Sequence, residues 1–300
     1  MPEPMHLSAV LGSYPHTAAL KSGALASPEV VLDFTEIEPI HKVFAPMVRR
    51  QAYDLTELAI VTAIQALAYG KPIVLLPLVV ASRLQRGCII ARRSDGPIDP
   101  RSLIGRKVGV RAYTQTTGMW VRAALREDYD FPVEDIRWVT SDPAHVEEYR
   151  DPAFVSHDGT GKSLPDQLRD GDIDAAILGN DLPKGDEFAK VIPDHHAKDE
   201  AWVAAHGFMP INHMVAVRRE TFDAHPQAVR AAYDLMAQAM RDTVRPAGEL
   251  DPTLHGVDAL RGPLAFIIEE CRRQALIPRP LDADAILAPA AALLEHEPAS

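Results

Sequence analysis

The chain has 300 residues, of which 47% are hydrophobic, and its formal net charge at pH 7 is −11. This length and apolar content are enough for one large domain or two smaller ones. Such an acidic chain is not expected to bind nucleic acid or to adhere to anionic membranes, although a local basic pocket could still hold a small anion. No apolar stretch is long enough to span a bilayer.

The N-terminal segment 1–17 has no basic start followed by a long apolar run, so we expect no secretory signal. Cys88 and Cys271 lie far apart in the sequence, each in apolar surroundings. We expect both to be buried thiols rather than partners in a disulfide. These features predict a cytoplasmic protein.

Strands and helices are predicted to alternate in the first third of the chain. The expected strands cover 6–11, 30–34, 55–58, 73–80 and 87–91, and the expected helices cover 17–21, 40–51 and 61–69. The run from Ile73 to Val80 is continuously apolar, which is typical of a strand that is buried on both faces.

The same alternation continues to the C-terminus. A one-turn helix should follow Asp99-Pro100, and strands are expected at 107–110, 136–139, 173–178 and 214–218. Helices are expected at 118–129, 164–169, 225–242, 257–275 and 282–295, before a loose tail at 296–300. Alternating strands and helices predict mostly parallel sheets with helices on both faces.

The order of the elements predicts two α/β lobes. Lobe one would combine residues 1–82 with 214–300, and lobe two would contain residues 83–213. The chain would leave lobe one near Ser82–Arg86 and return near His213–Arg218. Two such crossings form a hinge, and a hinge with a cleft between its lobes can close on a ligand.

The segment 105–122 predicts an anion site. A short strand leads through a polar turn into a helix whose start is rich in threonine, including Thr116 and Thr117. Backbone N–H groups and the positive end of the helix dipole converge there, as a carboxylate or phosphate requires. Arg122 could add a cation one turn later. The alternative is an ordinary capped helix, because Thr is a common N-cap residue.

Five segments, which together cover about residues 5–245, carry a family resemblance. They are Gly109-Val110-x-x-Tyr113-x-x-Thr116-x-x-x-Trp120-x-Arg122, Tyr53-Asp54-Leu55-Thr56-Glu57-Leu58, Ser82-Arg83-x-x-Arg86, Asp170-Gly171-Asp172-Ile173-Asp174-Ala175 and Pro210-Ile211-Asn212-His213-x-Val215. In this order they resemble the 4,5-dihydroxyphthalate decarboxylase family, which has the fold of type II periplasmic binding proteins. The resemblance implies that fold and the non-oxidative decarboxylation of a dihydroxyphthalate-like acid, with no organic cofactor.

The chain departs from the family pattern at several positions. Apolar residues and a threonine occupy 59–63, where the family has a polar run ending in tyrosine, and Gly87 replaces a histidine. Arg111-Ala112 replaces Pro-Glu, and the segment 179–183 replaces an Arg-x-Pro segment. His16 stands where the family tends to have an acidic residue. These changes leave the substrate, and the retention of decarboxylation, open.

Arg83, Arg86 and Arg122 are the candidate carboxylate-binding residues, because guanidinium groups bind carboxylates through two parallel hydrogen bonds. The alternative is that a hinge arginine pairs with Asp or Glu between the lobes. Other candidate substrate-binding residues are Tyr14, Tyr113, Thr116 and Thr117. Trp120 could stack on an aromatic ligand, but its helical spacing favours a place in the core.

His213, Glu57 and His16 are the candidate catalytic residues. Glu57 ends a predicted strand, where ligands meet open α/β sheets. His213 lies at the return crossing and is the leading proton donor for the ring carbon that loses its carboxylate. A structural role is the alternative for each residue, with Glu57 as the cap of the next helix.

Three motifs do not support other chemistry. Gly159-Thr160-Gly161-Lys162-Ser163 resembles the end of a P-loop, but Ser156 occupies the position of the required first glycine. His195-His196 has no partner at zinc spacing, and no Cys-x-x-Cys is present, so we expect no metal. No Gly-x-Ser-x-Gly elbow is present either.

The sequence leaves three functional classes open. The first is a decarboxylase of a small aromatic carboxylate, active in the catabolism of compounds such as phthalates. The second is a solute-binding or sensing protein with the same cleft and no catalysis. The third is another enzyme of small acids, such as an isomerase or a different lyase. All three predict a small anionic ligand without nucleic acid or membrane partners, and homo-oligomerisation stays open.

Overall fold

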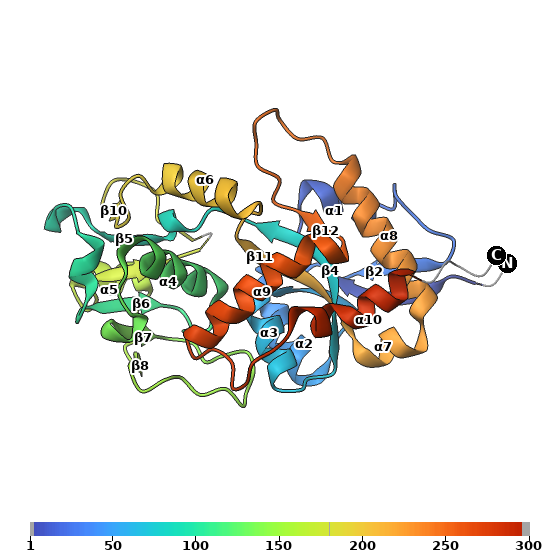
Figure 1. Ribbon diagram of the computed structural model, residues 1–300, viewed down its shortest axis with the longest axis horizontal. Helices are drawn as coiled ribbons and strands as arrows, with labels where there is room; N and C mark the ends of the chain where they lie inside the picture. The colour runs from blue at the N-terminus through green and yellow to red at the C-terminus, as the bar shows by residue number, and fades with distance from the viewer. Residues whose placement is uncertain (1–2, 180, 296–300) are drawn as a thin grey trace.

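The computed structural model describes residues 3–179 and 181–295, which form two six-stranded sheets. The sheets lie next to each other along the long axis of the molecule (Figure 1). The strand order is β12-β4-β11-β3-β1-β2 in sheet A and β10-β5-β9-β6-β7-β8 in sheet B. We use lobe one for the part built on sheet A and lobe two for the part built on sheet B. The tail predicted at 296–300 lies outside the described residues.

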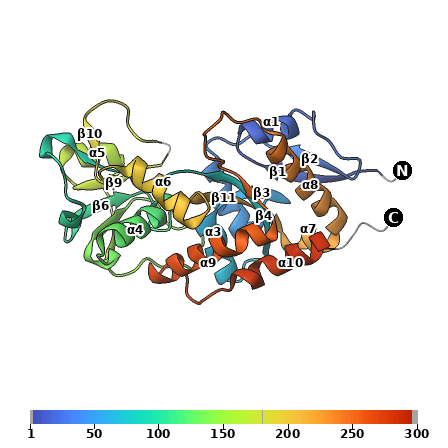
Figure 2. The same cartoon turned by 45° about the horizontal axis from the view of Figure 1, so that its top comes forward.

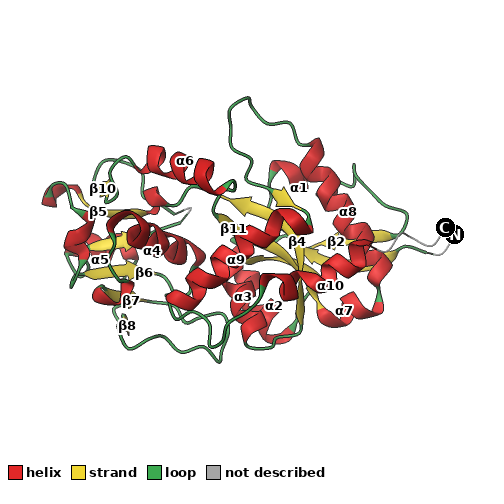
Figure 3. Cartoon of the chain, viewed as in Figure 1, coloured by secondary structure: helices red, strands yellow, loops and turns green. Residues whose placement is uncertain are grey.

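Sheet A consists of β1 (Met5–Val10), β2 (Val30–Phe34), β3 (Leu55–Ala59), β4 (Ile73–Ser82), β11 (Ile211–Arg218) and β12 (Leu254–His255). Sheet B consists of β5 (Ile89–Arg92), β6 (Lys107–Val110), β7 (Arg137–Thr140), β8 (Val155–His157), β9 (Ala175–Ile177) and β10 (Phe188–Lys190). The helices are α1 (Pro15–Lys21), α2 (Phe44–Arg50), α3 (Ile60–Ala68), α4 (Thr116–Tyr129), α5 (Leu164–Asp170), α6 (His195–His206), α7 (Arg219–Ala224), α8 (Pro226–Asp242), α9 (Val257–Arg273) and α10 (Ala283–Glu295). Helices flank the strands of both sheets (Figure 3).

The sheets are mixed, whereas the sequence predicts mostly parallel ones. In sheet A, β11 runs antiparallel to both β3 and β4. In sheet B, β5 runs antiparallel to both β9 and β10. The physical reason is the path of the chain: β4 carries it out of lobe one, and β11 brings it back in the opposite direction.

The position of β4 between two apolar cores explains why its sequence is apolar without interruption. Ile73, Leu75 and Val79 belong to one core cluster, which also contains residues of α2, α3 and α9. The alternate residues Val74 and Leu76 belong to a second cluster, which also contains residues of α8. Successive side chains of a strand point to opposite faces, so a sheet covered on both faces needs apolar residues at every position.

Several short elements have no counterpart among the sequence predictions. The strands β8, β10 and β12 contain only two or three residues, which is too few for a periodic pattern to show. The helix α6 buries only Asp199 and Trp202, so its apolar face is narrow. The strand predicted at 87–91 begins instead as a 3-10 turn, Arg86–Cys88, and continues as β5.

Hydrogen bonds hold the two crossings between the lobes together. The N–H of Arg83 donates to the carbonyl of Pro210 at 3.1 Å, and Gln85 Nε2 donates to Asn212 Oδ1 at 2.7 Å. The helix α9 contacts α3 of lobe one and α4 of lobe two, and both views place it across the middle of the molecule (Figure 2). The C-terminal region is therefore a third connection between the lobes, and the predicted domain boundaries stay a prediction.

Within residues 3–179 and 181–295, no helix has both the length and the apolar character needed to cross a membrane.

Candidate functional site

A cleft of about 760 Å³ opens between the two lobes. This volume lies within the range of about 300–1,000 Å³ that is usual for small-molecule sites. Lobe one contributes the end of β3, the start of α3 and the start of β11 to its walls, and lobe two contributes the start of α4 and the loop after β7.

Two helices from opposite lobes begin at this cleft. The N–H of Val61, in the first turn of α3, donates to Oγ1 of Thr116, the first residue of α4, at 3.3 Å. Both Thr116 and Thr117 line the cleft. The positive ends of two helix dipoles therefore meet at one place, which favours a bound anion.

Glu57 is the central carboxylate of lobe one. It is completely buried on β3, and its Oε1 accepts hydrogen bonds from Tyr14 Oη at 2.9 Å and from His213 Nδ1 at 2.7 Å. Its Oε2 accepts a hydrogen bond from the N–H of Gly12. Glu57 does not cap the next helix, which was its alternative role, because its carboxylate contacts the segment after β1 and His213 of β11.

The hydrogen bonds to Glu57 keep it ionised in spite of its burial. Burial by itself would raise the pKa of this carboxyl, but the hydrogen bonds from His213, Gly12 and Tyr14 and the charge of His213 hold the pKa below its usual value. Burial, together with the neighbouring Glu57 charge, raises the pKa of the Tyr14 phenol. Tyr14 therefore acts as a hydrogen-bond donor, and Glu57 as a carboxylate.

His213 lines the cleft at the start of β11. Its Nδ1 is engaged by Glu57, so Nε2 is the ring nitrogen left to meet a ligand. The ring of Phe44 packs edge-on against it, with centroids 5.2 Å apart. The buried carboxylate behind the imidazole fixes the orientation of the ring, as a positioned proton donor requires.

His16 lies behind this group instead of in the cleft wall. Its ring is buried and stacks on Tyr14 with centroids 5.1 Å apart. Burial and the charge of Arg245 lower the pKa of this histidine. The structure thus brings His16, Tyr14, Glu57 and His213 together as one cluster, of which Tyr14 and His213 reach the cleft.

Arg83 provides a cation at the start of α4. It lines the cleft, and its Nη2 donates to Thr117 Oγ1 at 2.5 Å. Gly179 lies so close that a Cβ atom there would sit 3.1 Å from Nη2 of Arg83. A glycine at this position leaves room for the guanidinium group beside the helix end.

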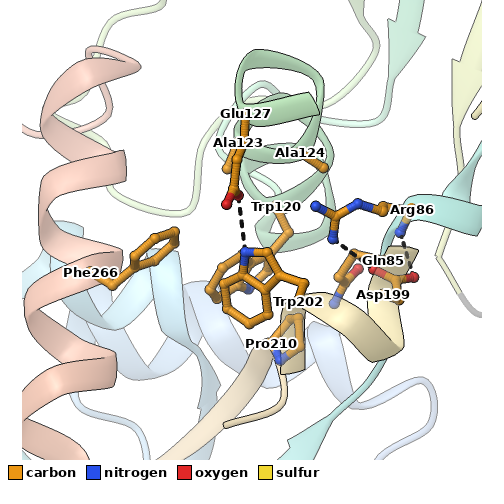
Figure 4. Close-up of a pocket in the computed structure, with 10 residues that line it drawn as sticks. All are labelled: Gln85, Arg86, Trp120, Ala123, Ala124, Glu127, Asp199, Trp202, Pro210 and Phe266. Carbon is orange, nitrogen blue, oxygen red and sulfur yellow. Dashed lines mark hydrogen bonds and ion pairs between the residues drawn. The ribbon is translucent and has the colours of Figure 1, made fainter. Parts of the chain in front are cut away.

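Arg86 lies outside the cleft and forms a buried ion-pair cluster. Its guanidinium group contacts Asp128 at 2.9 Å and Asp199 at 3.1 Å, and it borders a cavity of about 10 Å³ lined by Trp120 and Trp202 (Figure 4). A cavity of that volume holds at most one water molecule. Arg86 therefore pairs with acidic residues of the protein, as the alternative predicted, but both partners lie in α4 and α6 of lobe two and not in the other lobe.

Arg122 and Tyr113 are also placed outside the cleft, in the core of lobe two. Arg122 is fully buried and donates to the carbonyl of Tyr113 and to Gln274 Oε1, both at 2.7 Å. Its guanidinium carbon lies 4.0 Å from the centroid of the Tyr113 ring. These contacts attach α4 to the residue that follows α9, so this arginine connects the lobes and is not exposed to a ligand.

Several residues of the cleft were not singled out from the sequence. They are His41, Arg49, Thr62, Arg111, His145 and Asn212. Arg111 and His145 lie in loops, and the other four lie in three separate helical segments and in β11, so no local sequence pattern groups them. Three of them carried a signal in the family resemblance, because Asn212 precedes His213 in one of its segments and Thr62 and Arg111 lie at departures from the family pattern. Among the described residues, no group of three His, Cys, Asp or Glu side chains could hold a metal ion.

Two curated relatives are similar to this chain over most of its length. A 4,5-dihydroxyphthalate decarboxylase of Comamonas testosteroni is 27% identical over 235 residues, which cover 74% of this chain and 71% of the relative. A 4,5-dihydroxyphthalate decarboxylase of Pseudomonas putida is 25% identical over 181 residues, which cover 58% of this chain and 70% of the relative. No family model matches the chain.

Solved structures establish the fold. A periplasmic sulfonate-binding protein of Methylobacillus flagellatus superimposes with a TM-score of 0.55 at 10% identity, over 98% of this chain and 97% of the other. The ligand-binding component of an ABC-type import system of Staphylococcus aureus superimposes with a TM-score of 0.50 at 13% identity, over 93% and 95%. The chain has the two-lobe α/β fold of periplasmic binding proteins, and its similarity to the two decarboxylases is distant.

Proposed function

We propose that this protein is a non-oxidative decarboxylase of a small aromatic carboxylate related to 4,5-dihydroxyphthalate. The observation that carries the proposal is the hydrogen bond between His213 and the buried Glu57 at the wall of the cleft. A binding protein needs polar groups that hold its ligand, but it does not need a buried carboxylate behind a histidine. The distant similarity to two decarboxylases supports the same function.

The cleft offers a place for the carboxylates of such a substrate. Arg83 and Thr117 lie at the start of α4, where the helix dipole also favours negative charge. With one carboxylate held there, the ring would extend toward His213. The acidic surface of the chain does not oppose this, because the cations are local to the cleft.

In this proposal His213 supplies the proton of the reaction. Protonation of the ring carbon that bears the carboxylate interrupts the aromatic system, while a ring hydroxyl supplies electron density. The bond to the carboxylate then breaks, its electron pair restores the aromatic ring, and CO₂ leaves. His213 afterwards takes a proton from water, so the net reaction consumes one proton per CO₂. Through its hydrogen bond, Glu57 holds the imidazole in one orientation for the transfer.

The second candidate is a solute-binding protein of ABC-transporter type or a carboxylate sensor. The observation that favours it is the superposition of 98% and 93% of the chain on two binding proteins. Such a protein would use the same cleft, with Arg83 and the start of α4 holding the ligand, and would leave the ligand unchanged.

Cys88 and Cys271 are both buried thiols that are not paired with each other, which fits a reducing compartment. A cytoplasmic location is part of the proposal on this ground.

Incubation of the purified protein with 4,5-dihydroxyphthalate distinguishes the two functions. The decarboxylase proposal expects release of CO₂ together with 3,4-dihydroxybenzoate. A parallel thermal-shift series with aromatic and aliphatic carboxylates reports binding. Stabilisation by a carboxylate without release of CO₂ from any phenolic acid in the series would favour the binding protein.

A further inference from the structure

Arg111, an arginine of the cleft wall in lobe two, has hydrogen-bond donors that the protein does not use. It directly follows β6, and its carbonyl accepts hydrogen bonds from the N–H groups of Ser141 at 3.1 Å and Asp142 at 2.7 Å. Within residues 3–179 and 181–295 its side chain donates no hydrogen bond. The Asp142 carboxylate lies 3.6 Å from Nε, which is too far for one. Both Nη groups are therefore left for a ligand.

Arg49, a cleft arginine of lobe one, is by contrast fully engaged. Its Nε donates to the carbonyl of His145 at 2.8 Å, and its Nη2 donates to the carbonyl of Ala144 at 3.1 Å. Its Nη1 lies 3.1 Å from the carboxylate of Glu147. All three nitrogen atoms of the Arg49 guanidinium group thus have partners in the loop after β7. Arg49 attaches that loop to lobe one, whereas Arg111 faces the cleft with open donors.

Two histidines line the cleft close enough to Arg111 for its charge to act on them. His41 belongs to the 3-10 helix Ile40–Val43 of lobe one, and His145 belongs to the loop after β7. Nδ1 of His145 lies 2.8 Å from Oγ1 of Thr62, whereas the described part of the chain offers the His41 ring no hydrogen-bond partner. Burial and the charge of Arg111 lower the pKa of both imidazoles, that of His145 to about 4. Both rings are therefore neutral at pH 7.

A single turn separates Arg111 from the start of α4. The N–H of Gln115 donates to the carbonyl of Ala112 at 2.9 Å, which closes a β-turn. Arg111 immediately precedes this turn, and Thr116, the first residue of α4, immediately follows it. Their Cα atoms are therefore at most about 15 Å apart. The next residue of α4 accepts the hydrogen bond from Arg83, so the two arginines flank one short stretch of the cleft wall.

We propose that Arg111 and His41 form a second anion subsite of the cleft, which binds a carboxylate other than the one held at Arg83. A guanidinium group binds a carboxylate through two parallel hydrogen bonds, and a neutral imidazole can donate one more. The inference rests on the proposed function in placing an aromatic acid in this cleft. It deepens that function by naming a substrate class, acids with at least two carboxylates, and does not depend on the release of CO₂.

The position of Asp142 gives the proposal a second consequence. Its side chain lines the cleft, is 52% exposed, and is the carboxylate nearest to the Arg111 guanidinium group among the described residues. A ligand carboxylate that binds Arg111 is therefore repelled by Asp142. Removal of the Asp142 charge should strengthen binding of the ligand, and a purely structural role of Arg111 would not produce that gain.

Calorimetric titration with benzoate and with the three benzenedicarboxylates tests the proposal. We expect at least one dicarboxylate to bind the parent protein more tightly than benzoate does. Arg111→Met should weaken binding of that dicarboxylate by about tenfold, because a charged hydrogen bond is lost from a side chain that is partly exposed to water. Asp142→Asn should strengthen it by about two- to fivefold. Binding of benzoate should change far less in both variants, since Arg83 holds its single carboxylate.

The matched controls come from the exposed pair of Arg219 and Asp223, whose charged groups lie 3.5 Å apart. Arg219→Met and Asp223→Asn should bind every ligand as the parent protein does. If the expected pattern appears but 4,5-dihydroxyphthalate releases no CO₂, the decarboxylase function fails and the subsite stands. The inference is overturned if no dicarboxylate binds more tightly than benzoate, if Arg111→Met weakens both kinds of ligand equally, or if Asp142→Asn brings no gain.

Discussion

The carboxylate of Glu57 and the imidazole of His213 are joined by a hydrogen bond of 2.7 Å between two neighbouring antiparallel strands. In the register of the sheet, His213 pairs with Ala59, and Glu57 pairs with Val215. The two side chains are therefore diagonal neighbours on one face, where cross-strand groups can contact each other. The sheet itself positions the acid of the proposed reaction.

Removal of either member of this pair should abolish most of the turnover. We expect His213→Gln to lower kcat by about 10²–10⁴-fold, because the proton donor is lost. Glu57→Gln should also lower kcat, because the hydrogen bond that orients the imidazole is weakened. Binding of 3,4-dihydroxybenzoate, measured by calorimetry, should persist in both variants. The exposed Glu220 offers a control in Glu220→Gln, which should keep the parent rate; full turnover by His213→Gln would remove this residue from the mechanism.

A methyl group at Gly12 should disturb the contact between Tyr14 and Glu57. A Cβ atom there would lie 2.7 Å from ring atoms of Tyr14, closer than side chains tolerate. We expect Gly12→Ala to displace Tyr14 from Glu57 and to lower kcat at least tenfold, with a smaller effect on KM. Steady-state kinetics measure this. The matched variant is Gly159→Ala, where a Cβ atom meets nothing within 4 Å, and equal rates for the two variants would contradict the account.

Arg83 should determine the affinity for carboxylates. A hydrogen bond to a charged group contributes about 1.5–3 kcal/mol, so Arg83→Met should weaken binding of an aromatic dicarboxylate by roughly 10–100-fold. Arg83→Lys should recover only part of the affinity, because an ammonium group lacks the planar fork. Calorimetric titration provides the dissociation constants. The exposed Arg272, paired with Glu269, supplies the control Arg272→Met; unchanged affinity in Arg83→Met would place the carboxylate elsewhere.

Asp54 should stabilise lobe one in a pH-dependent manner. Its carboxylate accepts hydrogen bonds from Ser8, from Arg218 and from Thr221. Burial by itself would raise the pKa of this carboxyl, but these hydrogen bonds and the Arg218 charge bring the pKa below its usual value. The stabilisation is therefore complete above the usual pKa of an aspartate and is lost as the pH falls through the lower value of the folded protein.

We expect Asp54→Asn to reduce the free energy of unfolding by about 2 kcal/mol at neutral pH and by less in acid. Urea denaturation at several pH values measures the difference. The variant Asp223→Asn, at an exposed carboxylate paired with Arg219, should change stability only slightly at any pH. An equal loss of stability by Asp54→Asn at neutral and acidic pH would contradict the assigned role.

The elements that the sequence predicts well are the long ones with a periodic or continuous apolar pattern. The strand β4 and the helices α4, α8 and α9 lie close to their predicted bounds, because their burial follows directly from the pattern of apolar residues. Short strands such as β8 and β10 carry too few residues for that signal. The direction of β11 could not be predicted either, because it follows from the path of the chain between lobes.

Some residues of the candidate site could be named from the sequence, and others could not. Glu57, His213, Arg83 and the start of α4 were named because strand ends, crossings and helix starts meet in this type of fold, and all contribute to one region of the structure. Arg122 was named for its place one turn into α4, but that position faces α9 and the core. His145 lies in a loop, where sequence patterns say little, so only the folded chain places it against Thr62.

Decarboxylation in deuterated water tests the central claim most directly. The parent protein is mixed with 4,5-dihydroxyphthalate in D₂O, CO₂ is measured, and proton NMR locates the deuterium in the product. Our account predicts one deuterium at the ring carbon that lost its carboxylate, and recovery of bound, unchanged substrate from His213→Gln. A parent protein that binds the acid and returns it unchanged would contradict decarboxylation and leave the cleft as a binding site.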